Sequence, residues 1–451
     1  MPSRRPALAL AALLISAMAA TGCTGDGGDP DDPGTASPTP TGTPDPAELT
    51  LGVYGSEDEL VAWDAVVRGF NSVSDTIEVS LVEWANHTAA DRAIRGGEVP
   101  DVFLANRQDL HHLLADRVTR PVSELLDERG VDFGDRFSRD AVESFSVEDE
   151  LQCMPYSISP MVLYVNTDLV DFAKMERRGL DVPDRWDRWT LEEFTASAEF
   201  AARPARGSAG FHIEPSIEGL APFVYSGGGT LFDDPISPTT LTFSADETRE
   251  SLEQSLAVLR DASLTLTDEQ LAKRTPLEWF ERGQLGMIAG FRDLTPRLRL
   301  EQDLEFDVMP MPTLETSASV GDVTGLCLSA DSKEAASAAA LIAHLIDDSA
   351  VERVTRAGAM VPANLSVAAS DAFLQPGRQP ARARVFNSAV RGVVIAPLVS
   401  SWSDLEEAVA PGLTELLTAP GDLDLEAVTT SIDEASREVL DPELATEAPE
   451  E

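Results

Sequence analysis

Apolar segments of two kinds alternate along the first third of the chain. Apolar runs at residues 49–54, 77–84 and 101–105 have the length and composition of buried strands. Between them, apolar residues recur at helical spacing over residues 57–70, and a shorter helical pattern over residues 89–95 ends at two glycines. The alternation predicts an α/β fold in which helices cover a parallel sheet and ligands bind beyond the carboxyl ends of the strands.

A stretch rich in proline and hydroxyl groups follows at residues 150–166, ELQCMPYSISPMVLYVN. Two short apolar runs flank a polar link that contains Tyr156 and Ser157. The link lies between Pro155 and Pro160, which restrict the backbone and favour an extended, stiff conformation. The pattern fits two structures: a hinge that also lines a binding cleft, or an ordinary pair of strands inside one domain.

The remaining chain mixes helices and strands. Thr190 and Glu193 form a capping box that predicts a helix over residues 190–202. The sequence PFVYSGGGT at residues 222–230 predicts a loop, which lacks the lysine of a phosphate-binding loop. An apolar run at residues 320–329 predicts a further strand.

The first residues have the pattern of an export signal. Two arginines precede an apolar run at residues 7–20, which is shorter than a membrane-spanning helix needs. The small residues before Cys23 resemble the lipobox of bacterial lipoproteins, which implies a signal peptide at residues 1–22 and acylation of Cys23. Acyl chains would anchor the protein to the outer face of the cell membrane, and plain secretion is the alternative. Residues 23–47 lack large apolar side chains and predict a disordered tether.

Charge and cysteine content narrow the choice of partners. Acidic residues outnumber basic ones by 78 to 34, so the surface repels nucleic acid and anionic lipid. Apart from Cys23, the chain has only Cys153 and Cys327, which could form one disulfide outside the cell or remain separate buried thiols. No CxxC motif or Cys/His cluster indicates a metal site, and we expect no cofactor.

The sequence does not contain the common motifs of hydrolytic enzymes. GxSxG, HExxH and SxxK are all absent. We therefore expect a binding protein with no catalytic residues. Because the chain is rich in carboxylates, an exported glycoside hydrolase with two facing acids is the enzyme-class alternative.

Several segments occur in an order that resembles the extracellular solute-binding proteins of ABC transporters, and in particular the carbohydrate-binding, maltose-binding-protein-like branch. They extend from about residue 49 to about residue 439. After the lipobox and the tether, the segments are VPDVFLAN, CMPYSISPMVLYVN, VPDRWDRW, YSGGGTLF, GMIAGF, MPMP, VTGLCLSADS and VPAN.

This resemblance implies a two-lobe, periplasmic-binding-protein-like fold of type II, in which each lobe is a mixed sheet flanked by helices. About three chain segments would cross between the lobes, near residues 154–159, 316–325 and 360–364. The first lobe would comprise residues 48–156 and 317–361, the second residues 157–316 and 362–440, and residues 441–451 would form an acidic tail. The strands that carry Cys153 and Cys327 would then be neighbours, which favours the disulfide.

The resemblance also implies a sugar site. Sugars are held by aromatic faces that stack on the ring and by planar polar groups that bind its hydroxyls. Trp63 and Trp279 lie at helical spacing and are assigned to the core. By their position in the family pattern, the expected ligand-binding residues are Tyr54, Ser56, Trp84, Asn106, Arg107, Tyr156, Ser157, Tyr225, Phe291, Arg292 and Trp402.

The implied function is capture without chemistry. A monomeric, lipid-anchored subunit would enclose a sugar or oligosaccharide by closure of its lobes and deliver it to the membrane permease of an ABC importer. The alternatives are the exported glycoside hydrolase, a ligand sensor that does not transport, and a binder of a solute other than a sugar.

Overall fold

The computed structural model describes residues 46–442. The predicted signal peptide, Cys23 and almost all of the predicted tether and acidic tail lie outside these residues. Among the helices of residues 46–442, none combines the length and the apolar character needed to cross a membrane.

The first sheet contains the strands predicted at the start of the chain. Strands β1 (Ala47–Tyr54), β2 (Ile77–Trp84) and β3 (Val102–Asn106) run parallel, with β1 between the other two. Helix α1 (Glu57–Val73) begins at a capping box made by Ser56 and Glu59, and α2 (His87–Arg95) is capped by Asn86. The sheet is mixed rather than purely parallel, because the long strand β12 (Ser319–Ser329) returns antiparallel to β3.

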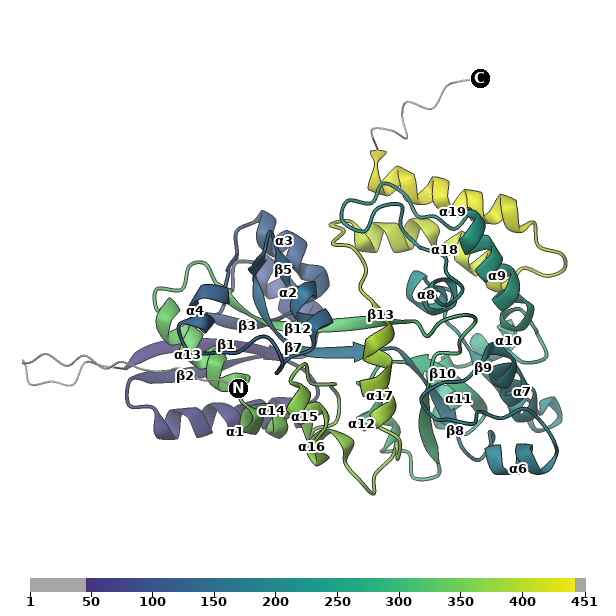
Figure 1. The fold of residues 1–451 in the computed structure, drawn as a ribbon, viewed down its shortest axis with the longest axis horizontal. Coiled ribbons are helices and arrows are strands. Elements are labelled where there is room, and N and C mark those ends of the chain that lie inside the picture. Colours follow the sequence, from purple (N-terminus) through teal and green to yellow (C-terminus); the bar gives the residue numbers. More distant parts are fainter. Residues whose placement is uncertain (1–45, 443–451) are drawn as a thin grey trace, which may run out of the picture. The chain divides into compact units, whose positions relative to one another are not determined.

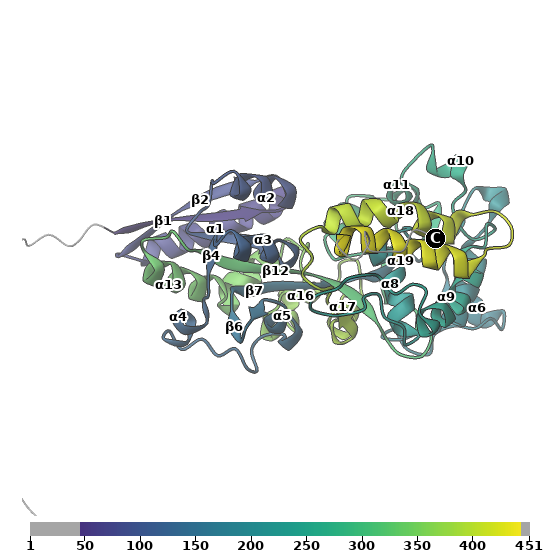
Figure 2. The ribbon, with the colours of Figure 1, turned by 90° about the horizontal axis from the view of Figure 1, so that it is seen from above.

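Three further strands pair with β12. Strand β7 (Cys153–Pro160) and strand β4 (Thr119–Arg120) are antiparallel to it, and β13 (Val393–Val394) is parallel to it. Figures 1 and 2 show β7 and β12 extending together from the first sheet.

The second sheet is formed by later segments. Its order is β11 (Phe306–Pro310), β8 (Val162–Asn166), β10 (Leu285–Gly290) and β9 (Ala209–His212). Strand β8 follows β7 almost directly in the chain, so the stretch at residues 150–166 passes from one sheet to the other. Helices α18 (Trp402–Thr418) and α19 (Leu425–Leu440) pack against each other, as both views show, and contribute to the core beside this sheet.

Shorter helices complete the two halves. Those that contribute to the core around the first sheet are α3 (Leu110–Ala115), α4 (Ser123–Asp127), α5 (Arg139–Ser144), α13 (Ala335–Leu345), α14 (Asp348–Thr355), α15 (Leu365–Ala368) and α16 (Asp371–Leu374). Those that pack in the cores beside the second sheet are α6 (Phe172–Arg177), α7 (Leu191–Ala201), α8 (Ile217–Ser226), α9 (Asp246–Leu259), α10 (Asp268–Leu271), α11 (Pro276–Glu281), α12 (Leu294–Leu298) and α17 (Arg384–Ala389).

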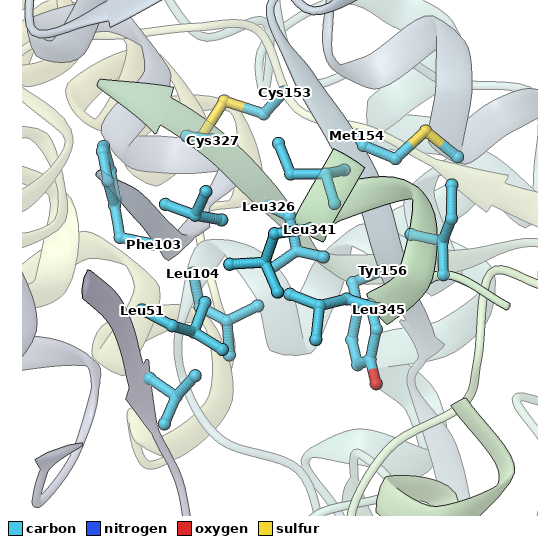
Figure 3. Packing of buried hydrophobic residues seen from close by; sticks show 14 of the residues in the cluster. Leu51, Phe103, Leu104, Cys153, Met154, Tyr156, Leu326, Cys327, Leu341 and Leu345 are labelled. Atoms are coloured by element: carbon cyan, nitrogen blue, oxygen red, sulfur yellow. A yellow bond between two sulfur atoms is a disulfide. The ribbon is translucent and has the colours of Figure 1, made fainter. Parts of the chain in front are cut away.

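The buried hydrophobic residues form separate cores for the two sheets. One cluster gathers side chains from β1, β3, β7 and β12, and Figure 3 shows its centre around Leu326 and Leu341. Two other clusters cover the second sheet. Separate cores on two mixed α/β sheets confirm the predicted two-lobe fold class. Trp63 and Trp279, assigned to the core, are indeed buried.

The segment after Val361 differs from the predicted lobe boundary. Ala363, Val367 and Ala372 pack in the core of the first sheet, whereas Val361 and Phe373 belong to a core of the second. The chain therefore does not leave the first lobe at Val361, because α15 and α16 pack on α14. It contacts both cores until Phe373.

Cys153 and Cys327 form a disulfide between β7 and β12, where they occupy paired positions. Both residues are fully buried (Figure 3). The bond therefore joins the two long strands that extend from the first sheet, close to the crossing.

The predicted loop at residues 222–230 is wrong in its first half. Residues up to Ser226 form the end of α8, and only the glycines that follow make the turn. Pro222 is the sixth of the ten residues of α8, beyond the first turn, and as a proline it donates no backbone hydrogen bond within the helix.

Candidate functional site

Two adjoining cavities lie where the ends of the first sheet meet residues of the second half, and Asp322 and Phe291 line both of them. We call the two cavities together the cleft. The first is lined chiefly by Asn106, Arg107, Glu218, Tyr225, Phe232, Val320, Ile395 and Trp402. The second is lined chiefly by Tyr54, Ser56, Glu59, His87, Tyr156, Ser157, Ser159, Asp293 and Thr324.

The carboxyl ends of the parallel strands supply one wall of the cleft. Tyr54 ends β1, and Ser56 follows it as the N-cap of α1. Asn106 ends β3 and caps the next turn by accepting a hydrogen bond from the N–H of Gln108. The amide of Asn106 also donates to the carboxylate of Asp322 over 2.5 Å. Strand ends thus place polar groups at the cleft, as expected for this sheet type.

The crossing strands supply the floor. The Ser157 hydroxyl lies 2.7 Å from that of Thr324 on the paired strand β12. The ring of Tyr156 packs on Trp63, with 4.9 Å between ring centroids. The hydroxyls of Tyr156 and Tyr54 are buried and have no hydrogen-bond partner within residues 46–442. Since buried polar groups normally have partners, these two phenols are candidates for contacts with a bound molecule.

Aromatic residues supply the opposite wall. Trp402 is the first residue of α18 and lies 6.2 Å from Phe232, centroid to centroid. Tyr225 stands near the end of α8, and its burial raises its pKa to about 12. Phe291 follows directly after β10. All four rings line the first cavity, and Phe291 lines the second as well.

Four of the carboxyl groups that line the cleft have a raised pKa, and burial is the main cause for each of the four. Burial raises the pKa of Glu218 to about 7, with smaller contributions from the charges of Asp322 and Glu406. The pKa of Asp293 is raised by burial and then by the charge of Asp322. Burial also raises the pKa of Asp322 itself, against the effect of its hydrogen bond from Asn106. Burial raises the pKa of Glu59 as well.

A histidine and an aspartate pair beside this wall. The Nε2 atom of His87 lies 2.7 Å from a carboxylate oxygen of Asp109, and this hydrogen bond raises the pKa of His87. His87 lines the cleft, whereas Asp109 does not.

Most of the predicted ligand-binding residues lie on the walls of the cleft. Their contact with a ligand remains a prediction. They are Tyr54, Ser56, Asn106, Arg107, Tyr156, Ser157, Tyr225, Phe291 and Trp402.

Arg292, also predicted to bind ligand, lies outside the lining of both cavities. Its side chain is fully buried, its Nε donates to the carbonyl of Gly358 over 3.0 Å, and its guanidinium lies 4.8 Å from the ring centre of Phe373. At the end of β10, Phe291 faces the cleft, so its neighbour Arg292 points into the core behind it. Burial lowers the pKa of Arg292 to about 10.

Trp84 also lies outside the lining of both cavities. A methyl group added to Gly52 would meet the Trp84 ring at 2.5 Å and Pro100 at 2.7 Å, so the indole covers the glycine of the neighbouring strand. The lack of a side chain at Gly52 lets the ring fold back on the sheet rather than toward the cleft.

Several cleft residues were missed by the sequence analysis, above all Asp322, Glu218, Asp293 and Phe232. Asp322 is a lone acid within the strand sequence SVGDVTGLCLS, and Glu218 is a lone acid in the apolar helix IEGLAPF. A single carboxyl group in an otherwise apolar element is costly to bury, and this signal could have identified both residues.

One group of three residues brings its potential metal ligands within 4.8 Å of one another among residues 46–442: Asp91, Asp109 and His112. None of them lines the cleft. The guanidinium of Arg95 already holds Asp91 at 2.9 Å and lies 2.7 Å from Nδ1 of His112, so a metal ion would compete with a resident cation.

Comparison with solved structures gives the same fold in several sugar-binding proteins. A substrate-binding protein of Listeria monocytogenes in complex with cycloalternan has a TM-score of 0.70 and 19% identity, covering 87% of this chain and 99% of the other. The sugar-binding protein MalE of Xanthomonas citri has a TM-score of 0.73 and 16% identity, covering 89% and 100%. The cyclic α-maltosyl-1,6-maltose binding protein of Arthrobacter globiformis has a TM-score of 0.69 and 17% identity, covering 88% and 100%.

Sequence comparison identifies the family directly. No curated protein matches the chain. Residues 66–379 match the bacterial extracellular solute-binding protein family, which covers most of the two sheets and the crossing strands described above. The chain is a member of the bacterial extracellular solute-binding protein family.

Proposed function

We propose that this protein captures a sugar or an oligosaccharide in the cleft and delivers it to the membrane permease of an ABC importer. The observation that carries the proposal is the composition of the cleft. Trp402, Tyr225 and Phe291 offer ring faces, whereas Asn106, Asp322 and the free phenol of Tyr156 offer hydrogen-bonding groups. This is the combination that sugar rings need, because their C–H faces are apolar and their edges carry hydroxyls.

The related structures support the choice of a sugar. One of the proteins with this fold is in complex with cycloalternan, and another binds cyclic α-maltosyl-1,6-maltose. Because their identity to this chain is below 20%, these proteins establish only the fold. The proposed ligand class depends on the residues of this chain's own cleft.

Capture would proceed by closure of the two lobes around the crossing segments. Strands β7 and β12 pair along most of their length, and Val361 and Ala363 hydrogen-bond to the backbone of β7. The ligand must contact both lobes, because only contacts made in the closed state favour closure. Asn106 and Tyr54 belong to the first lobe, Trp402 and Tyr225 to the second. We propose lobe boundaries near those predicted, with the third crossing extended to Phe373.

Attachment to the outer face of the cell membrane through Cys23 completes the proposal. A tether formed by residues 23–47 would keep the binding unit close to the permease and raise its local concentration there. This part of the proposal rests on the sequence pattern.

A thermal-shift panel tests the sugar assignment. Monosaccharides, oligosaccharides, amino acids, peptides and metal salts are added to the purified protein, and the melting temperature is recorded. Binding to the native state raises it. We expect some saccharides to do so. A response only to amino acids, peptides or metals would overturn the sugar assignment.

An exported glycoside hydrolase is the rival, and one observation favours it. A carboxyl group with a pKa near 7, such as Glu218, suits a general acid at neutral pH. Incubation of the panel saccharides with the protein separates the two functions. We expect no new reducing ends; their release, and its loss in Glu218→Gln, would establish the hydrolase.

A further inference from the structure

The cleft carries more negative groups than its own positive groups neutralise. Six carboxylic residues line it: Glu57, Asp58, Glu59, Glu218, Asp293 and Asp322. The two arginines that line it are both engaged. Arg107 donates through Nε to the carbonyl of Ser144 over 3.0 Å, and Arg297 forms an ion pair with Glu281 over 2.5 Å.

The inner carboxyl groups have no lysine or arginine as a partner in the described chain, although the charge of His87 acts on Asp322. Glu59, Glu218, Asp293 and Asp322 form no ion pair with Lys or Arg within residues 46–442. Asp322 accepts one side-chain hydrogen bond, from Asn106. Burial raises the pKa of both Glu218 and Asp293, and the charge of Asp322 is the next cause. If the cleft closes over a neutral ligand, these carboxyl groups are buried further with no positive charge from the ligand, which disfavours their ionised form.

A second feature points into the same space. The phenol of Tyr156 is buried, lines the second cavity with Asp322, and has no partner within the described residues. The Tyr54 hydroxyl is unpartnered in the same cavity. These groups can accept a hydrogen bond from an N–H as readily as from a hydroxyl.

A metal ion is a weaker candidate for the missing positive charge. Divalent ions need several oxygen or nitrogen ligands gathered around one point. Among the His, Cys, Asp and Glu side chains of residues 46–442, three ligand atoms come within 4.8 Å of one another only at Asp91, Asp109 and His112, away from the cleft carboxylates. A group that makes separate hydrogen bonds to spaced carboxylates suits the cleft better.

We propose that the ligand carries a protonated amine, as in an amino sugar or an oligosaccharide with a basic nitrogen, and that Asp322 binds this nitrogen with Glu218 and Asp293 nearby. The proposal rests on the proposed sugar-binding function and specifies its substrate class. The aromatic side chains of the cleft would stack on the sugar rings, and a cation close to the face of an aromatic ring is also favoured.

A dependence on pH follows for such a ligand. Around Asp322 the groups that titrate or carry charge are His87, Asp109 and Tyr54, together with Glu218 and Asp293; Glu406 acts on Glu218, and Glu59 on Asp293. Glu218 gains its negative charge as the pH rises through about 7. Affinity for the ammonium form should therefore rise between about pH 5.5 and 7.5, whereas affinity for a neutral sugar should not.

Matched saccharides test the proposal. Each of several ring scaffolds is used in three forms that carry a hydroxyl, a free amine or an acetamide at the same carbon: glucose, glucosamine and N-acetylglucosamine, and their β-linked oligomers up to four units. Titration calorimetry at pH 7 measures their affinity for the purified protein. We expect an amine form to bind at least tenfold more tightly than its two neutral counterparts.

Three variants locate the effect. Asp322→Asn keeps the shape of the side chain, and we expect it to reduce the amine preference at least tenfold; Glu218→Gln should reduce it less. Glu253→Gln changes an exposed acid on α9 outside the cleft and should leave the preference unchanged. Thermal melts check that each variant folds. If Asp322→Asn does not fold, the reduced amine preference of Glu218→Gln serves as the test.

The outcomes separate this inference from the proposed function. Neutral saccharides that bind as tightly as their amine counterparts overturn the inference and leave the sugar function intact. A preference that survives both cleft substitutions overturns the placement at Asp322. If no saccharide binds in the matched set or in the thermal-shift panel, the sugar function falls, and the inference falls with it.

Discussion

Asn106 donates a 2.5 Å hydrogen bond to Asp322, although the two residues are 216 positions apart in the chain. The bond joins the end of β3 to the neighbouring strand β12, at the point where both cavities meet. An amide from a strand end thus holds an acid on a crossing strand in place. This pair fixes the centre of the cleft.

Trp402→Ala should weaken ligand binding by about tenfold to a hundredfold, because buried aromatic anchors dominate such contacts. The measurement is titration calorimetry with a saccharide that responds in the thermal-shift panel. Trp186→Ala is the matched control, since this indole packs on Phe172 outside the cleft. Equal affinities of the Trp402 variant and the parent would remove Trp402 from the site.

Arg292→Met should destabilise the protein by about 2–4 kcal/mol, since it leaves the carbonyl of Gly358 without its donor and alters a packed core. Denaturant unfolding measures this loss. The exposed Arg139→Met serves as control and should leave the stability nearly unchanged. A Met variant as stable as the parent would show that the buried guanidinium is dispensable.

Loss of the disulfide should lower stability substantially. Cys153 and Cys327 are 174 positions apart. A disulfide that closes so long a loop lowers the conformational entropy of the unfolded chain, which stabilises the folded state by up to about 5 kcal/mol. The double variant Cys153→Ala/Cys327→Ala should therefore unfold at lower denaturant concentration.

Thiol titration checks the bond itself. In a Cys23→Ser form, unfolded without reductant, we expect no reactive thiol. Two reactive thiols would contradict the disulfide.

Glu218 should make stability depend on pH. Its pKa is raised from 4.5 to about 7 in the folded protein, chiefly by burial, so the folded state binds the proton more tightly than the unfolded state. Stability is then lost as the pH rises from about 4.5 through 7. Glu218→Gln lacks the titrating carboxyl group and does not lose stability in this way. The free energy of unfolding of Glu218→Gln, relative to that of the parent, should therefore increase by about 1–2 kcal/mol between about pH 5.5 and 8.

Denaturant unfolding at the two pH values measures that difference. Glu253→Gln, an exposed acid, should show no such trend. A stability difference between Glu218→Gln and the parent that does not change with pH would contradict the raised pKa.

The sequence was sufficient for the elements that have strong local patterns. The strands at residues 49–54 and 77–84 and the helix at 57–70 appear close to their predicted bounds, because apolar periodicity and the Ser56 cap act locally. The helix predicted over residues 190–202 from its capping box is also present, as α7 (Leu191–Ala201).

The side chains that the sequence misplaced depend on contacts far along the chain. Arg292 is drawn into the core by the carbonyl of Gly358 and the rings of Phe373 and Phe386. Trp84 turns back because Gly52, on the neighbouring strand, leaves room for it. The spacing of residues along the chain does not predict such long-range contacts. The order of the strands likewise does not predict that β12 places Asp322 in the cleft.

A crystal structure of the protein with the saccharide that stabilises it most in the thermal-shift panel tests the central claim most directly. The account predicts sugar rings in the cleft, stacked on Trp402 or Tyr225 and hydrogen-bonded to Asn106, Asp322 or the Tyr156 hydroxyl. A saccharide bound anywhere else, with the cleft filled only by solvent, would contradict it.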